Sequence, residues 1–139
     1  MSIQEYLEIV VKKDASDLHL VTGSPPVVRI DGGLLPIASG IITPEDSESL
    51  VSELLSSEQK EMFAINKEID FSFALGDVAR FRVNAYYQKG YVSAALRLIP
   101  NKIKTIEELN LPRILHNFAQ LSQGFILITG PTGHGKSTA

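Results

Sequence analysis

The sequence contains no cysteine among its 139 residues. This absence excludes a disulfide-linked scaffold, a thiolate metal site and thiol chemistry, and it fits a reducing compartment. Long apolar runs are missing too, since no segment approaches the roughly 20 residues that a membrane-spanning helix needs. The first residues include acidic side chains and lack the apolar stretch of a signal peptide. We therefore expect no direct insertion into a membrane.

An excess of positive charge is also absent. The chain has 13 Lys and Arg residues against 16 Asp and Glu residues, which gives a formal net charge of −3. A general nucleic-acid binder needs a basic stripe or cluster, so we expect no nucleic-acid partner. With 44% hydrophobic and 21% charged residues, the composition is that of an ordinary globular protein. The length suits one domain, or one domain and a piece of another.

The first part of the sequence predicts helices mixed with short strands. Capping residues mark three helix starts, at Ser2, Thr43 and Ser56, and each is followed by apolar residues at helical spacing. Pro and Gly residues separate short runs that are typical of strands. The predicted elements are helices over residues 2–13, 43–55 and 56–66, and strands over residues 17–21, 27–31 and 34–38. Asp14, Asp17 and His19 lie close together in this part, and we interpret them as structural residues rather than metal ligands.

Between residues 69 and 99, apolar and polar residues alternate with a period of two. This pattern predicts three antiparallel strands with one buried face, joined by turns at residues 76–78 and 89–90. If residues 89–90 form a two-residue hairpin loop, apolar residues face one another across the last two strands. The same register places Arg82 directly opposite Arg97 on the other face.

Two like charges in direct opposition destabilise a hairpin, so an anionic group is expected near Arg82 and Arg97. A three-residue turn at residues 76–78 would place Ser72 beside Arg82 and Asp70 on a diagonal from it. Asp70, or solvent, is then one candidate for compensation. The other is a bound polyanion, with the two arginines as prongs of a phosphate clamp. Geometry alone favours compensation by Asp70 or solvent. Only a phosphate-binding loop elsewhere in the chain adds weight to the bound polyanion.

After residue 100 the pattern changes. Thr105 and Glu108 have capping-box spacing, which predicts a short helix over residues 105–109, and apolar spacing predicts an amphipathic helix over residues 111–119. Residues 124–129 form an unbroken apolar run, typical of a strand buried on both faces of a parallel sheet. We therefore predict two domains, residues 1–100 and residues 101–139, with the boundary at residues 100–104.

The predicted strand leads directly into a phosphate-loop motif. Residues 130–137 match G-x-x-x-x-G-K-[ST] at every fixed position. In such a loop, backbone N–H groups cradle phosphate oxygens, while Lys136 would bridge the β- and γ-phosphates and Ser137 would ligate Mg²⁺. The sequence thus predicts ATP and Mg²⁺ as cofactors. The predicted nucleotide-binding residues of the loop are Gly130, Pro131, Thr132, Gly133, His134, Gly135, Lys136, Ser137 and Thr138.

A P-loop ATPase also needs an acidic residue on a second strand for Mg²⁺ and a residue that positions the attacking water. The given sequence stops at Ala139, before either could occur. We therefore expect a truncated ATPase domain that is inactive alone. We also expect residues 125–139 to be irregular, or paired with another chain, because their sheet neighbours are missing.

Six segments together resemble the secretion ATPases of type IV pili, and among these the twitching-motility retraction ATPases of the PilT type. They are ASDLHLVTG (15–23), PPVVRIDG (25–32), RFRVNAYYQKG (80–90), ALRLIP (95–100), TIEELNLP (105–112) and GFILITGPTGHGKST (124–138). The segments run in order along essentially the whole chain. His134 departs from the pattern, since the family commonly has Ser there.

The resemblance implies an α+β fold. A PAS-like N-terminal domain with an antiparallel sheet and flanking helices would be followed by the truncated start of a RecA-like α/β P-loop domain. It also implies a cytoplasmic hexamer at the inner face of the cell membrane, whose partner is the inner-membrane platform of the type IV pilus and which uses ATP hydrolysis to power pilus retraction. Arg82 and Arg97 match catalytic arginines that reach the nucleotide phosphates, and Arg113 matches a nucleotide-binding position. Two alternatives stay open: a pilus-assembly or type II secretion ATPase, and a PAS-like ligand-sensing or interaction module.

Overall fold

A computed structural model describes residues 1–99, 105–131 and 135. The chain divides into two compact units, Met1–Asn101 and Lys102–Ala139. The boundary predicted at residues 100–104 lies outside the described residues.

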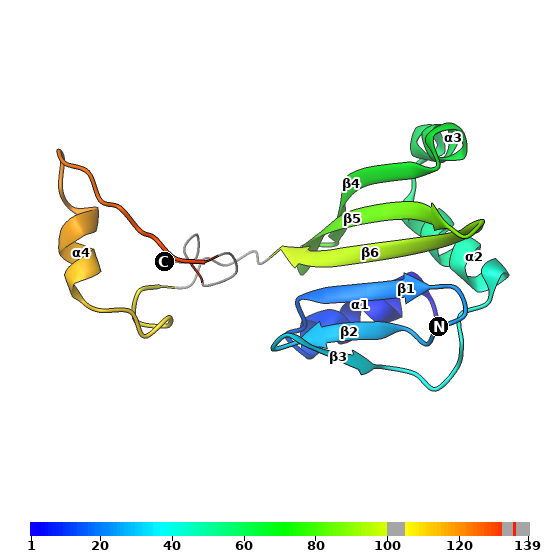
Figure 1. The fold of residues 1–139 in the computed structure, drawn as a ribbon, viewed down its shortest axis with the longest axis horizontal. Helices are drawn as coiled ribbons and strands as arrows, with labels where there is room; N and C mark the ends of the chain where they lie inside the picture. The colour runs from blue at the N-terminus through cyan, green and yellow to red at the C-terminus, as the bar shows by residue number, and fades with distance from the viewer. Residues whose placement is uncertain (100–104, 132–134, 136–139) are drawn as a thin grey trace. The chain divides into compact units, whose positions relative to one another are not determined.

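A six-stranded sheet forms the frame of the first unit. Its strands are β1 (Asp17–Val21), β2 (Val27–Ile30), β3 (Gly33–Pro36), β4 (Glu68–Leu75), β5 (Ala79–Gln88) and β6 (Tyr91–Ile99). Their order across the sheet is β3-β2-β1-β6-β5-β4, and every pair is antiparallel (Figure 1). The central β1–β6 pair brings together two strands that lie near opposite ends of the sequence of this unit. The α+β class with an antiparallel sheet is thus confirmed.

Three helices accompany the sheet, and each begins where its capping residue predicts. They are α1 (Ile3–Lys12), α2 (Pro44–Leu54) and α3 (Ser57–Asn66). The hydroxyls of Ser2, Thr43 and Ser56 each accept a hydrogen bond from the backbone N–H three residues later, and the side chain at that position bonds back to the capping residue. These capping boxes satisfy N–H groups that would otherwise lack a partner at the helix starts.

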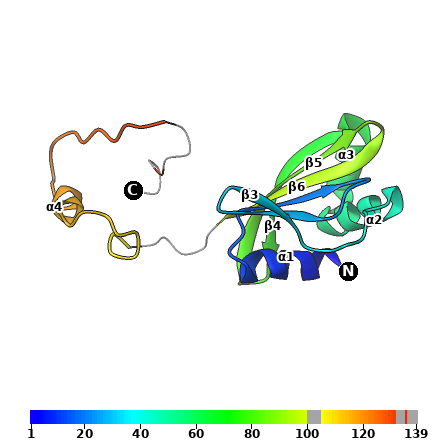
Figure 2. The same ribbon diagram turned by 60° about the horizontal axis from the view of Figure 1, so that its bottom comes forward.

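The hydrophobic core lies between the helices and one face of the sheet (Figure 2). Leu18, Phe81 and Leu96 point into it from β1, β5 and β6, and Leu7 and Val10 meet them from α1; all five are at most 1% exposed. Burial of each such side chain contributes about 1.5–3 kcal/mol. Because side chains alternate along a strand, the residues between these apolar positions project from the other face, which no described helix of this unit covers.

The turn between β5 and β6 fixes the register of this hairpin. Lys89 and Gly90 both have positive φ angles, 52° and 86°. Two successive residues of this kind form the tight turn whose twist matches paired strands. Phe81 therefore lies opposite Leu98 and Arg82 opposite Arg97, as the sequence predicts.

In the second unit the helix α4 (Ile114–Ala119) forms within the range predicted for it. The prediction of a helix over residues 105–109 is wrong, because this stretch forms turns. Its capping bonds are present, with Thr105 Oγ1 accepting from the Glu108 N–H at 3.2 Å. The chain then leaves the helical path at Asn110, which has a φ of 51°, and Pro112 follows. A left-handed residue followed closely by proline prevents a helix from continuing. The stretch therefore forms only a single turn and not the predicted helix.

The strand predicted over residues 124–129 is also absent from the structure. Phe125 and Leu127 are 86% and 71% exposed. A strand of this apolar type needs a neighbour on each side and layers above and below. No described strand pairs with the segment, so it is irregular, as expected when its sheet neighbours are missing.

Candidate functional site

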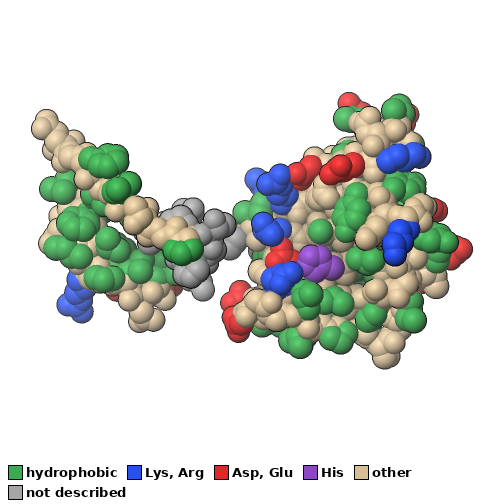
Figure 3. Space-filling view, in the orientation of Figure 1, with side chains coloured by type: hydrophobic (Ala, Val, Ile, Leu, Met, Phe, Trp, Pro, Cys, Tyr) green, Lys and Arg blue, Asp and Glu red, His purple; other side chains and the backbone are tan. Residues whose placement is uncertain are grey.

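Polar side chains gather on the sheet face opposite the helices. We call this set the polar face; it consists of Asp17, His19, Arg29, Asp70, Arg82, Asn84 and Arg97. Five of the six strands contribute to it, and most of its members line a hollow of about 320 Å³. Figure 3 shows Arg and acidic side chains alternating across this face, with a histidine among them.

Arg82 and Arg97 are directly opposite each other at the centre of the polar face. Arg82 donates from Nε to both carboxylate oxygens of Asp70 at 3.1 Å, and from Nη2 to Oδ2. The interpretation that Asp70 compensates Arg82 is therefore confirmed, as is the pairing of Ser72 with Arg82. Arg82 thus bonds outward to the neighbouring strand β4, away from Arg97 on β6.

The carboxylate that compensates Arg97 is Asp17, a residue that the sequence alone does not connect with Arg97. Arg97 Nε donates to Asp17 Oδ1 at 2.9 Å, and Arg29 Nε lies 3.4 Å from Oδ2. The Ser16 hydroxyl donates to the same Oδ2 at 2.8 Å. Asp17 thus links β2, β1 and β6 on this face.

The surroundings of Asp17 keep its carboxyl group ionised. Burial alone would raise its pKa, but the hydrogen bonds from Arg97 and Ser16 and the charge of Arg97 outweigh burial, so the pKa is lowered. The hydrogen bond from Arg82 likewise lowers the pKa of Asp70. Both carboxylates are therefore charged at neutral pH, where each forms an ion pair with its arginine.

The arginines remain accessible although they are paired. The side chain of Arg82 is 67% exposed and that of Arg97 is 73% exposed, whereas that of Asp17 is only 11% exposed. A guanidinium has five N–H donors in a planar fork, so one carboxylate does not exhaust it. The polar face can therefore present two positioned guanidinium groups to an anion that approaches from solvent.

His19 also lies in the hollow. Its Nε2 is buried and meets no hydrogen-bond partner within the described part of the chain. A buried nitrogen without a partner costs about 1–3 kcal/mol. A group that entered the hollow and bonded to His19 would recover part of this cost.

The structure describes only part of the predicted phosphate loop. Gly130, Pro131 and Gly135 are described, and Gly135 has a φ of 76°, a left-handed conformation that glycine adopts without strain. The remaining predicted loop residues lie outside the described residues; they are Thr132, Gly133, His134, Lys136, Ser137 and Thr138. Arg113 is described, directly before α4, in the second unit.

No cluster of three or more His, Asp or Glu side chains in residues 1–99, 105–131 and 135 could hold a metal ion. Ser137, the predicted Mg²⁺ ligand, is outside this range. No described helix is long and apolar enough to cross a membrane.

Comparison with known proteins finds relatives along the whole chain. The type IV pilus retraction ATPase PilT of Pseudomonas aeruginosa is 40% identical over 138 residues, which are 99% of this chain and 40% of PilT. The type IV pilus ATPase PilU of the same organism is 36% identical over 139 residues, all of this chain and 36% of PilU. Along its whole length, the chain is thus similar to members of the secretion ATPase family. It spans about 40% of the length of these relatives.

A solved structure of this family shares the fold. The crystal structure of the pilus retraction motor PilT with bound ADP matches 99% of this chain and 40% of its own, with a TM-score of 0.79 at 40% identity. No family model matches the chain. The resemblance found in the sequence is therefore confirmed by relatives and by structure.

Proposed function

We propose that this chain is part of a hexameric P-loop ATPase that uses ATP hydrolysis to power type IV pilus retraction. The observation that carries the proposal is the similarity to PilT along 99% of the chain, together with the paired arginines of the polar face. In this proposal residues 1–100 form a PAS-like domain and residues 101–139 begin a RecA-like ATPase domain. The protein would act in the cytoplasm, at the inner-membrane platform of the pilus.

Arg82 and Arg97 would act as a clamp on the nucleotide phosphates. Asp70 and Asp17 each hold one side of a guanidinium, which fixes its direction without covering it. Fixed guanidinium groups stabilise the charge that develops on phosphate oxygens during transfer, and they need no rearrangement when the reaction occurs. The carboxylates of Asp70 and Asp17 would thus orient the two guanidinium groups before the nucleotide binds.

The phosphate loop would hold the nucleotide itself. Lys136 would contact the β- and γ-phosphates, Ser137 would ligate Mg²⁺, and the glycines would let backbone N–H groups approach the phosphate oxygens. Mg²⁺, when bound, would neutralise charge on these oxygens. Arg113 would contact the nucleotide from the segment before α4.

The motor function is tested in the organism that carries the gene. A strain whose complete gene carries Lys136→Ala should assemble surface pili but should not twitch, because pilus retraction requires ATP turnover. Restoring the original gene should restore twitching. If the Lys136→Ala strain twitched normally, the retraction function would be wrong. If the strain lost its pili, an assembly ATPase would be the better assignment.

A further inference from the structure

His19 is the residue of the polar face to which the arginine clamp assigns no role. It lies on β1 between Leu18 and Leu20, which are both 0% exposed and point into the core. Because side chains alternate along a strand, the imidazole ring projects from the opposite face of the sheet, where it lines the hollow of about 320 Å³. The ring therefore belongs to the same surface as the two arginines.

The strand register explains why this ring lacks a partner. The direct neighbours of His19 are Val27 on β2 and Ala95 on β6, and neither of these side chains can form a hydrogen bond. Asp17 lies two residues earlier on the same face, but its carboxylate oxygens already bond to arginine and serine side chains. The surroundings of His19 thus provide room and no acceptor.

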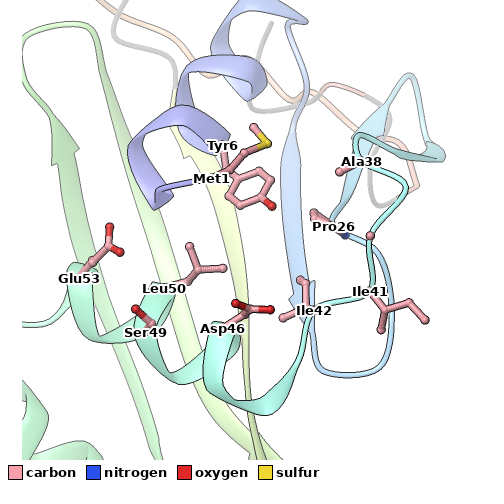
Figure 4. Close-up of a pocket in the computed structure, with 11 residues that line it drawn as sticks. Met1, Tyr6, Pro26, Ala38, Ile41, Ile42, Asp46, Ser49, Leu50 and Glu53 are labelled. Atoms are coloured by element: carbon pink, nitrogen blue, oxygen red, sulfur yellow. The ribbon is translucent and has the colours of Figure 1, made fainter.

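The consequence is a buried nitrogen that makes no hydrogen bond. Among residues 1–99, 105–131 and 135, Nε2 of His19 is the one buried side-chain nitrogen or oxygen without a partner. The pocket between α1 and α2, into which the Tyr6 hydroxyl points, contains no such atom in this part of the chain (Figure 4). Folded proteins pair nearly all buried polar atoms, and an exception commonly marks the place of a bound group.

The charges of the polar face favour an anion as that group. Its ion pairs join three arginines (Arg29, Arg82 and Arg97) to two carboxylates (Asp17 and Asp70), which leaves an excess of one positive charge among these groups. The side chains of Arg82 and Arg97 are 67% and 73% exposed, whereas that of Asp17 is 11% exposed, so the guanidinium groups reach solvent and the buried carboxylate does not. An imidazole that carries its proton on Nε2 can donate to an anion held by these arginines.

We propose that His19 is a third phosphate-binding residue of the polar face. An oxygen of a phosphate group that enters the hollow accepts a hydrogen bond from Nε2–H of His19 and further bonds from Arg82 and Arg97. Arg97 is a diagonal neighbour of His19, since Arg97 pairs with Asp17 and His19 with Ala95. Diagonal neighbours lie roughly 7–8 Å apart, which long side chains span. This inference rests on the proposed function, because the phosphate is that of the nucleotide.

The test uses inorganic pyrophosphate as the probe. The 139-residue chain carries Lys136→Ala, which disables the predicted phosphate loop, and nitrogen NMR follows the imidazole rings. We expect a saturable shift of the Nε2 signal of His19 toward the protonated donor form, with a dissociation constant on the order of 1 mM. His116, whose Nε2 already bonds to Glu107 at 2.6 Å, is the internal reference and should not respond. No saturable change at His19 would overturn the proposal.

Replacement of His19 separates a binding role from a structural one. His19→Phe keeps a ring and removes both nitrogens, so pyrophosphate should bind roughly 5–10-fold more weakly. The thermal midpoint should not fall, because the variant also removes a buried nitrogen that lacks a partner. His19→Gln offers an amide donor near the position of Nε2 and should restore most of the affinity. His116→Phe is the matched control, because His116 does not line the hollow, and it should leave the affinity unchanged.

A lower thermal midpoint with unchanged affinity in His19→Phe would refute the proposal, because it would show a structural histidine. Equally weak binding by His19→Phe and His19→Gln would also refute it, because the lost hydrogen bond would not be the cause.

Arg97→Ala in the same assay separates this inference from the proposed function. If Arg97→Ala weakens pyrophosphate binding and His19→Phe does not, the arginine clamp stands and only the role of His19 is wrong. If neither variant weakens binding, the polar face does not bind phosphate, and the proposed clamp fails as well.

Discussion

Asp17 offers a sharp test of how the polar face is held together. Asp17→Asn keeps the size of the side chain but removes its charge and one of its two acceptor oxygens. The contacts affected are the hydrogen bonds from Arg97 at 2.9 Å and Ser16 at 2.8 Å, of which the amide oxygen can keep one, and the ion pair with Arg29 at 3.4 Å, which is lost. A hydrogen bond to a charged group contributes about 1.5–3 kcal/mol. Arg97 is 73% exposed and regains water when its partner is lost, so the lower end applies. We expect a loss of about 1.5–2 kcal/mol in the free energy of unfolding.

Urea unfolding of Asp17→Asn, Arg97→Gln and the double variant measures the coupling between the two side chains. We expect a coupling energy of about 1 kcal/mol, since one partner is buried and the other is exposed. The pKa of Asp17 is lower in the folded chain than its usual value of 3.8, so its contribution is present above that value and is lost as the pH falls through the folded pKa. The stability difference between the original chain and Asp17→Asn should therefore shrink below pH 3.8. A coupling energy of zero, or a difference that persisted in acid, would refute the reasoning.

Two further predictions concern the same sheet. The Asp70–Arg82 pair, whose side chains are 42% and 67% exposed, should show a weaker coupling than Asp17–Arg97, and about 1 M NaCl should abolish it in the same urea assay; a coupling that resisted salt would contradict the exposure argument. Gly90→Ala should destabilise the chain by about 1–2 kcal/mol because Gly90 has a φ of 86°, whereas Gly40→Ala, where an added Cβ also meets no atom within 4 Å and φ is not left-handed, should leave the thermal midpoint nearly unchanged.

Local patterns in the sequence were enough to predict much of this fold. Capping residues at Ser2, Thr43 and Ser56 marked the helix starts, because a cap involves only residues three apart. The Lys89-Gly90 turn fixed the register of β5 and β6, so the opposition of Arg82 and Arg97 followed from alternation alone.

The missed features depend on contacts between distant parts of the chain. Asp17 meets Arg97 only because β1 pairs with β6, a contact across 80 residues that no local pattern contains. Tyr6 fits the apolar stripe of α1 by spacing, and only the packing against α2 shows where its hydroxyl points. The strand predicted at residues 124–129 failed for the same kind of reason, since a buried strand is stable only beside other strands.

The central claim, that the polar face acts on nucleotide phosphates, is tested most directly by ATP turnover of the complete protein that contains this chain. Arg82→Ala and Arg97→Ala should each lower turnover, by roughly 10³-fold if they act as arginine fingers do. Arg80→Ala is the matched control, because Arg80 lies on the same strand, pairs with Ile99 and does not line the hollow. The account predicts near-normal turnover for Arg80→Ala alone. Near-normal turnover in both Arg82→Ala and Arg97→Ala would contradict it.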